Sequence, residues 1–233
     1  MVLAYEQIGT GLRLGEGAQF YARHPRWSRM GAAVFDAMSA VDLLLSGGGG
    51  GGGADQAGAD DALAFPAVDA SRVFLVGYGS LGGPAALLAA AADARVAGVA
   101  TVCGWSPLRN DTDAARSGGA RRFFERHATL PRLGLFRGAA QADIPADFDD
   151  ALALVAPRPA LVVQPLRDRM NDAALVAGAV ARLQPGYPLL SLQTPDGVNA
   201  VGDGAVAAVA AWAAAAEAPA AWAAAAAAAL LRV

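Results

Sequence analysis

Short runs of apolar residues alternate with helical patterns along most of the chain. Four runs are rich in β-branched residues and are bounded by turn-forming residues, which is typical of strands buried in a parallel sheet. They are Val73–Val76, Val96–Val102, Ala160–Gln164 and Leu189–Leu192. A fifth short strand is expected at Val2–Tyr5, almost at the first residue.

Helical spacing of apolar residues fills the segments between these strands. Helices are predicted at Met30–Leu45, Pro84–Ala92, Asp172–Leu183 and Ala205–Trp212. Segment 6–17 reads as loop because glycines interrupt it, and segment 20–28, with its aromatics and His-Pro, reads as loop or a short turn of helix. The alternation of strand and helix predicts an α/β fold, with a doubly wound, mostly parallel sheet and helices on both faces.

Three segments depart from this alternation. Seven consecutive glycines predict a disordered insertion at 46–61, because their backbone entropy opposes order and no side chain packs. The long polar, Gly-rich stretch 105–150 predicts a functional loop or a small cap. Residues 213–233 read as an alanine-rich extension of one domain spanning 1–212. A transmembrane helix over 205–231 is not expected, because alanine favours insertion weakly and Glu217 and Pro219 interrupt the run.

Composition narrows the possible partners. The formal charge of −3 is spread over mixed acids and arginines without a basic stripe, so neither nucleic acid nor an acidic membrane is an expected partner. No secretory signal is recognisable after Met1, and a cytoplasmic location is the default expectation. The single cysteine, Cys103, follows a predicted strand and is expected to be a buried thiol rather than a nucleophile. No metal site and no cofactor are predicted, because neither histidine has ligand partners at suitable spacing.

The run VFLVGYGSLGG at 73–83 carries the strongest functional signal. A strand, a glycine-flanked turn and a helix in this order can raise one serine hydroxyl above a parallel sheet. The same letters contain G-x-G-x-x-G at Gly77, Gly79 and Gly82, which is a dinucleotide fingerprint. That fingerprint needs an acidic residue at the end of the next strand, and the residues there are ATVCG. A hydrolase turn is therefore favoured, and an NAD(P)- or FAD-binding protein is the weaker alternative.

A serine hydrolase needs a nucleophile, an acid and a base. Ser80 is the predicted nucleophile, and the backbone N–H of Leu81 is the predicted oxyanion donor at a helix N-terminus. Asp168 follows the strand Ala160–Gln164, where a triad acid would lie. The only histidines are His24 and His127, and neither follows the last strand. His127 is the one possible base, and without a positioned base Ser80 is a weak nucleophile.

Several segments, in order, resemble α/β-hydrolases of the dienelactone-hydrolase and acetyl-xylan-esterase-like group. They include VFLVGYGSLGG, RVAGVATVCGWSPLR, LPRLGLF and ALALVAPRPALVVQPLRDR, within a match from about Val2 to Trp212. The resemblance implies an eight-stranded α/β sheet and a serine nucleophile that acts on carboxylic esters. Ser80 and Asp168 fall on positions that match the family pattern.

Three departures from that pattern shape the functional expectation. Gly79 is an extra residue in the turn, so alignment from the helix makes Ser80 the nucleophile and alignment from the strand puts Gly79 there. No histidine follows the last strand, and VLAYEQIG resembles the family's fourth strand, which predicts an N-terminally truncated chain lacking the first strands. We expect an impaired or inactive serine esterase, with a small-molecule ester as its substrate if active. The alternative is a non-catalytic binding or scaffold module of the same fold, and the oligomeric state stays open.

Overall fold

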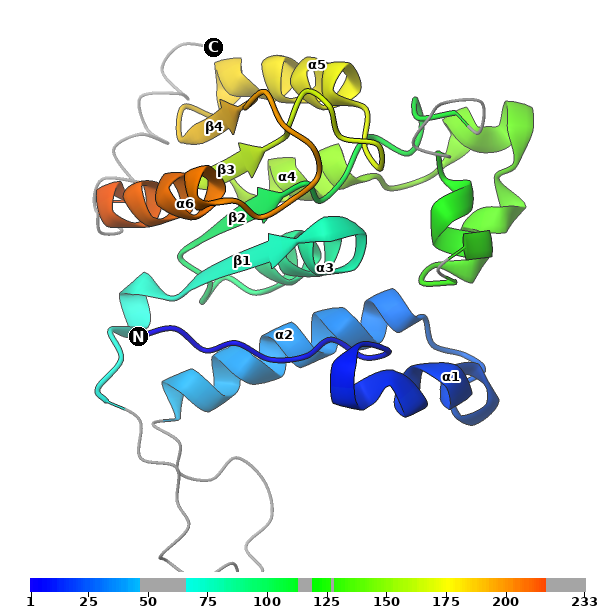
Figure 1. Cartoon of the computed structure of the whole chain (residues 1–233), viewed down its shortest axis with the longest axis horizontal. Coiled ribbons are helices and arrows are strands. Elements are labelled where there is room, and N and C mark those ends of the chain that lie inside the picture. Colours follow the sequence, from blue (N-terminus) through cyan, green and yellow to red (C-terminus); the bar gives the residue numbers. More distant parts are fainter. Residues whose placement is uncertain (47–65, 113–118, 127, 217–233) are drawn as a thin grey trace, which may run out of the picture.

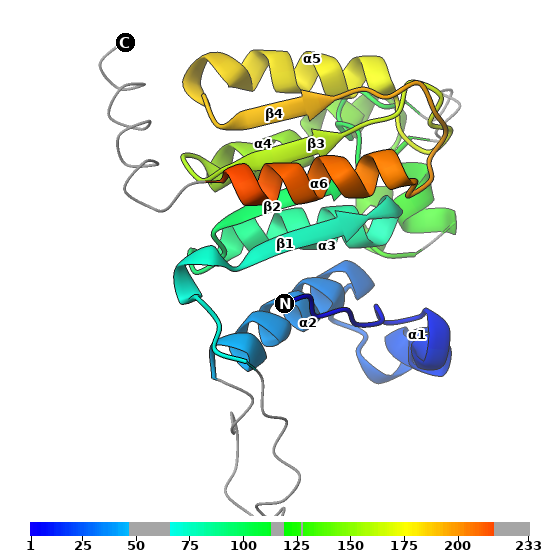
Figure 2. The ribbon, with the colours of Figure 1, turned by 60° about the vertical axis from the view of Figure 1, so that its left-hand side comes forward.

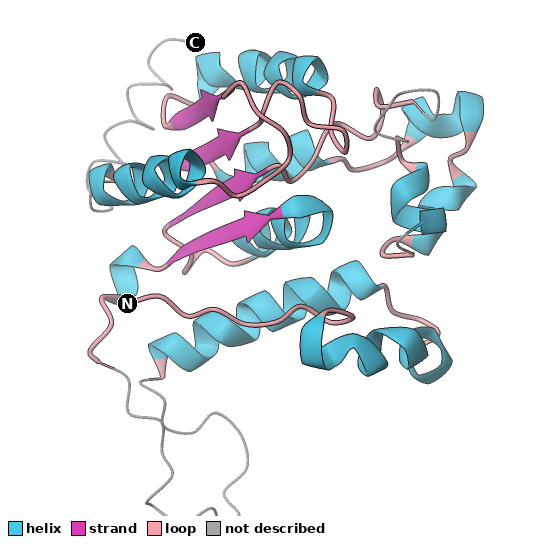
Figure 3. Ribbon diagram, viewed as in Figure 1, coloured by secondary structure: helices cyan, strands magenta, loops and turns pink. Residues whose placement is uncertain are grey.

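Four parallel strands form the centre of the computed structural model, which describes residues 1–46, 66–112, 119–126 and 128–216. The strands are β1 (Phe74–Tyr78), β2 (Gly98–Val102), β3 (Ala160–Val163) and β4 (Leu190–Gln193), and they lie side by side in chain order (Figure 1). In the register, Val76 lies opposite Ala100, and Ala100 lies opposite Leu161. All four strands point the same way (Figure 3), so their C-terminal ends share one edge.

The described part of the chain also contains six α-helices. They are α1 (Leu14–Arg23), α2 (Arg29–Leu45), α3 (Gly79–Ala92), α4 (Phe148–Val155), α5 (Ala173–Leu183) and α6 (Asp203–Ala215). Helix α6 crosses one face of the sheet, while α3 and α4 lie on the other (Figure 2). Side-chain caps set several helix starts: Ser28 accepts from Gly31, Asp172 accepts from Ala174, and Asp147 forms a capping box with Asp150.

The two central strands, β2 and β3, are almost wholly apolar because both of their faces are covered. Val99 and Val162 face a larger core that includes side chains of α3, α4 and α5. Leu161 and Val163 face the opposite side, where they form a smaller core against Val209 and other residues of α6. Successive residues of a strand point to opposite faces, so burial on both faces removes polar alternation from the sequence of β2 and β3.

Strand β1 is the edge of the sheet in the described part of the chain, where it pairs with β2 alone. The side chains of Phe74, Val76 and Tyr78 alternate onto one face of β1. The Phe74 ring meets Trp212 of α6 edge-on, with ring centroids 5.4 Å apart. Val76 is 55% exposed and Tyr78 47% exposed, so this face of β1 is only partly covered beyond Phe74.

The structure confirms the α/β sheet and the four strands, with bounds that shift by one or two residues. Two local predictions are wrong. Residues 2–5 form no strand, and the predicted loop 6–17 contains the start of helix α1, which continues to Arg23 in the segment predicted as loop or a short turn of helix. Glycines obscured α1 in the sequence, but one of them is needed for packing: a Cβ on Gly17 would lie 2.4 Å from the Gly9 Cα. An ion pair of 2.5 Å between Arg13 and Asp36 also ties the start of α1 to α2.

Some predictions concern residues that the structure does not describe, or the boundaries of such segments. All of the predicted insertion 46–61 except Ser46 lies outside the described residues, as do 217–233 of the predicted extension. Helix α6 continues past the predicted boundary at Trp212, to Ala215. No helix in the described ranges is both long and apolar enough to span a membrane.

Candidate active site

The turn from β1 into α3 lies at the C-terminal edge of the sheet. Tyr78 ends β1, and Gly79 begins α3 with a left-handed backbone, at φ +69°. The turn is tight because a Cβ on Gly77 would lie 2.1 Å from the Gly82 carbonyl oxygen. Glycine at 77 is therefore required for helix and strand to approach this closely.

This geometry bears on the two alignments that the sequence leaves open. In a G-x-S-x-G turn, the nucleophile is the second residue after the first glycine and lies on the strained turn itself. Counted from Gly77, that residue is Gly79, which also has the left-handed backbone. Ser80 follows it as the second residue of α3, half-buried, and its hydroxyl has no hydrogen-bond partner among the described residues. The role of Ser80 as nucleophile stays a prediction.

The N-terminus of α3 supplies the backbone donors that the oxyanion prediction requires. The first N–H groups of a helix have no partner within the helix, and they attract negative charge. Leu81 is the third residue of α3, and the residue before the helix, Tyr78, provides no side-chain cap. The Leu81 N–H therefore belongs to a set of backbone donors that could bind an anion, and its role in catalysis stays a prediction.

Asp168 lies in the turn after β3, and neighbouring groups surround its carboxylate. One oxygen accepts from the backbone N–H groups of Met170 at 2.7 Å and Asn171 at 3.3 Å. The other accepts from the side-chain amides of Gln164 at 3.0 Å and Asn171 at 2.9 Å. Four local donors therefore engage the group predicted as the triad acid.

A buried polar network continues from Asp168 beneath the strand ends. The Asn171 side chain donates to the Cys103 carbonyl at 2.8 Å and accepts from Arg122 at 2.9 Å. Arg122 is fully buried, also donates to Ser106 at 3.3 Å, and lies 3.8 Å from Asp111. Burial lowers the pKa of Arg122, and the charge of Asp111 opposes that shift. Sequence reasoning missed this network, because its members are scattered along the chain without a motif.

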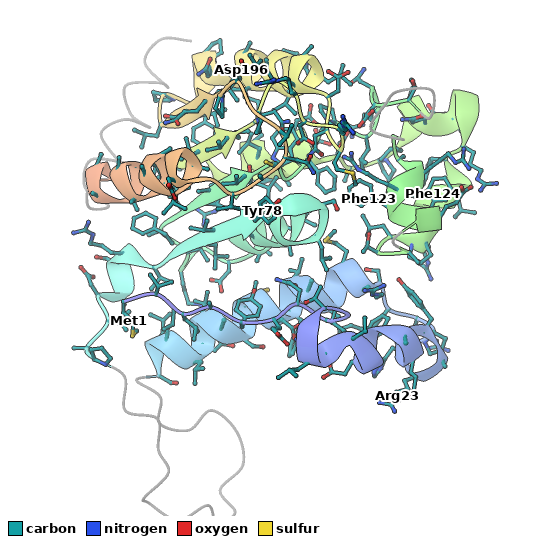
Figure 4. All side chains as sticks on the ribbon, viewed as in Figure 1. Met1, Arg23, Tyr78, Phe123, Phe124 and Asp196 are labelled. Atoms are coloured by element: carbon teal, nitrogen blue, oxygen red, sulfur yellow. The ribbon has the colours of Figure 1, made fainter. Side chains whose placement is uncertain are left out.

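The loop after β4 occupies the place where a triad histidine was expected. Backbone hydrogen bonds of 3.0 Å from Leu166 to Pro195 and 2.9 Å from Arg167 to Gly197 join it to the loop that carries Asp168. An ion pair of 2.8 Å between Arg167 and Asp196 adds to this connection (Asp196 is labelled in Figure 4). The sequence of the loop, TPDGVNAVG at 194–202, contains no histidine.

Tyr78 connects the first strand to the same loop. Its hydroxyl donates a hydrogen bond of 3.0 Å to the Asn199 carbonyl (Tyr78 is labelled in Figure 4). Burial raises the pKa of Tyr78, and the neighbouring Cys103 and Asp168 raise it further. Residues from the ends of β1, β2 and β3 therefore lie within electrostatic reach of one another, although no hydrogen bond joins Ser80 to Asp168 in the described part.

The two histidines do not complete this arrangement. His24 follows α1 and is exposed, and its ring packs against Phe20 with centroids 5.3 Å apart. No hydrogen bond among the described residues joins His24 to Ser80 or Asp168. His127, the possible base, lies outside the described residues. Within those residues, no three His, Cys, Asp or Glu side chains gather at a possible metal site.

Cys103 directly follows β2 and is a buried thiol, as the sequence predicted. It is 1% exposed and has a left-handed backbone with φ +52°. Burial is the main cause that raises its pKa to about 12, and the charge of Asp168 adds to it. A thiol with this pKa stays protonated at neutral pH and is a poor nucleophile.

Comparison with known proteins identifies the fold. No protein-family model matches the chain, and no curated protein matches it significantly in sequence. Among solved structures, a promiscuous carbohydrate esterase family 15 (CE15) esterase from a marine bacterial metagenome superposes with a TM-score of 0.63 at 18% identity. The match covers 86% of this chain and 53% of that chain. The chain has an α/β-hydrolase fold.

Two further structures agree with this fold. A glucuronoyl esterase from Solibacter usitatus has a TM-score of 0.58 and 21% identity, over 80% of this chain and 48% of its own. A CE15 glucuronoyl esterase from Caldicellulosiruptor kristjansonii has a TM-score of 0.58 and 20% identity, over 83% of this chain and 53% of its own. The chain therefore spans about half the length of these α/β-hydrolases, and identity at this level shows the fold alone.

Proposed function

We propose that this chain is a relative of serine carboxylic-ester hydrolases whose hydrolytic activity is impaired. Ser80 is the proposed nucleophile, the Leu81 N–H the proposed oxyanion donor, and Asp168 the proposed acid. The observation that carries the proposal is the β1–α3 turn: a left-handed residue between strand and helix, at the C-terminal edge of an α/β-hydrolase sheet.

The proposed substrate is a small carboxylic ester. Three of the solved structures that share the fold are described as esterases, two of them as glucuronoyl esterases. Ester cleavage would use the backbone N–H groups at the start of α3 to stabilise the negative oxygen that forms when Ser80 attacks. Asp168 would orient a base, which we expect from outside the described residues, since no hydrogen bond among the described residues joins His24 to Ser80 or Asp168.

Three features support impairment. The turn residue Gly79 has no hydroxyl, and the Cα of Ser80 lies one residue further along, about 3.8 Å from that of Gly79. Asp168 already accepts four hydrogen bonds from its own neighbourhood. The loop 194–202 offers no histidine. Each departure lowers the rate of attack, because nucleophile and base must both be held in reacting geometry.

Ester hydrolysis by the purified chain tests the proposal. The wild-type chain, Ser80→Ala and the control Ser191→Ala, an exposed serine of β4, are compared with p-nitrophenyl acetate and a fluorophosphonate probe. We expect turnover near the uncatalysed rate and no labelling for all three. Rapid turnover that Ser80→Ala abolishes and Ser191→Ala preserves would contradict impairment while confirming Ser80 as nucleophile. Rapid turnover that survives Ser80→Ala would refute the assignment of Ser80.

A further inference from the structure

A pocket of about 410 Å³ lies between two segments that are distant in sequence, 21–28 and 130–146. Two hydrogen bonds connect these segments close to the pocket. The Tyr21 hydroxyl donates to the Ala128 carbonyl, and the Met30 N–H donates to the Thr129 carbonyl at 3.0 Å. These two hydrogen bonds hold the segments that form the pocket next to each other. Neither Ser80 nor Asp168 lines it, so it is separate from the candidate active site.

The interior of this pocket is apolar and aromatic. Trp27 stands on one wall with 56% of its surface exposed, and Leu133 and Phe136 form the other wall. Ile144 lies buried at the pocket, and prolines from both segments contribute to the lining. A volume of this size and a lining of this kind are typical of sites for small organic molecules. An exposed tryptophan facing other apolar groups offers a flat surface for a ring.

Two arginines give the pocket its charge. Arg26 and Arg132 line it from opposite segments, and no aspartate or glutamate lines it. Neither arginine forms an ion pair or a side-chain hydrogen bond among the described residues. Arg109 and Arg137, by contrast, each pair with a carboxylate at 2.6 and 2.5 Å. The guanidinium groups of the pocket thus keep their donors available for an anion.

We propose that this pocket binds a small organic anion. A ring would lie against Trp27 and Phe136, and a carboxylate would accept hydrogen bonds from Arg26 and Arg132. Planar, two-donor pairing of guanidinium with carboxylate provides the selectivity for charge, and burial of the ring provides the apolar share of the affinity. The proposal does not depend on hydrolysis by Ser80.

Calorimetric titration of the full chain with trans-cinnamate and with cinnamamide tests the charge requirement. The two probes have nearly the same shape and differ in the negative charge. We expect cinnamate to bind at about millimolar Kd or tighter, and the amide at least about tenfold more weakly. Failure of cinnamate to bind at about 10 mM, or equal binding of both probes, would overturn the proposal. Equal binding would instead describe a neutral apolar site.

Variants then locate the binding. The double variant Arg26→Ala/Arg132→Ala should lower cinnamate affinity at least about tenfold, to that of the amide. Arg23→Ala, which removes an exposed arginine of α1 labelled in Figure 4, should leave both affinities unchanged. Trp27→Ala should weaken acid and amide together. An equal loss in Arg23→Ala and the double variant would place the anion elsewhere and refute the site. Circular dichroism and thermal melts of each variant confirm that it is folded.

Discussion

The side chain of Arg122 donates a hydrogen bond of 2.9 Å to the side-chain oxygen of Asn171, across 49 residues of sequence. Both side chains are buried, and the Asn171 amide nitrogen donates onward to Asp168 and to the Cys103 carbonyl. Asn171 thus connects a buried cation to the loop that holds the proposed acid. The arrangement positions Asp168 through its neighbours rather than through a histidine.

Replacement of Asn171 by alanine should destabilise the protein strongly. The change leaves Arg122, Asp168 and the Cys103 carbonyl each without one buried partner, and unsatisfied buried groups of this kind cost about 2–4 kcal/mol together. Urea unfolding measures the loss. The matched control is Asn110→Ala, at an exposed asparagine, which should change stability by less than about 0.5 kcal/mol. Equal stability of the two variants would show that the network contributes little.

Gly77→Ala should disrupt the turn between β1 and α3. Its Cβ would lie 2.1 Å from the Gly82 carbonyl oxygen, a backbone atom that cannot yield without moving the helix. We expect a loss of about 2–4 kcal/mol in the free energy of unfolding, comparable to severe overpacking. Thermal and urea denaturation provide the measurement.

Gly178→Ala is the control for that substitution. Gly178 lies inside α5, where a Cβ would meet nothing closer than the end of the Arg182 side chain, at 3.7 Å. Alanine there should stabilise the protein by about 0.5–1 kcal/mol, because it restricts the unfolded chain and favours helix. Similar effects of both substitutions would contradict the close approach at Gly77.

Elements with a local signal in the sequence could be predicted, and features that depend on packing in the folded chain could not. The apolar runs at 98–102 and 160–163 identified β2 and β3, because burial on both faces leaves a continuous hydrophobic signal. The start of helix α1 was not predicted. Gly17 has to be glycine because it packs against Gly9, and a packing contact of this kind leaves no periodic signal in the sequence. Ser80 and Asp168 could be proposed from their places after strands. The Arg122–Asn171 contact could not, because it joins segments that only the folded chain brings together.

Acidification should lower the free energy of unfolding, partly through protonation of Asp93, which follows α3. Arg95 donates three side-chain hydrogen bonds to its oxygens, at 3.0 and 3.2 Å from Nε and 2.6 Å from Nη2, and these hold the pKa of Asp93 below its usual value. The unfolded chain then binds this proton more readily, at a pKa of about 3.9. The contribution is therefore complete above about pH 4 and is lost as the pH falls through the lower, folded pKa.

Asp93→Asn tests this dependence by urea unfolding at several pH values. We expect the variant to be less stable than wild type by about 1–2 kcal/mol at pH 7, since hydrogen bonds to a charged group are lost. The two stabilities should converge on acidification. Asp143→Asn, at an exposed carboxylate without an ion pair in the described part, should track wild type at every pH. A constant gap between Asp93→Asn and wild type down to acid pH would exclude the proton-linked explanation.

Cys103 should resist thiol reagents until the protein opens. It is 1% exposed, and its pKa of about 12 leaves almost no thiolate at pH 8. It is also the only cysteine, so each modified molecule carries one label at a known place. We expect no reaction with a chromogenic disulfide reagent in native buffer and one thiol per chain in concentrated guanidinium. Because the thiol directly follows β2, an interior strand of the sheet, the rate of modification of the native protein should follow global unfolding and rise in Asn171→Ala. Full modification of the native wild type within minutes would contradict this expectation. It would show that the C-terminal ends of the strands open locally, without global unfolding.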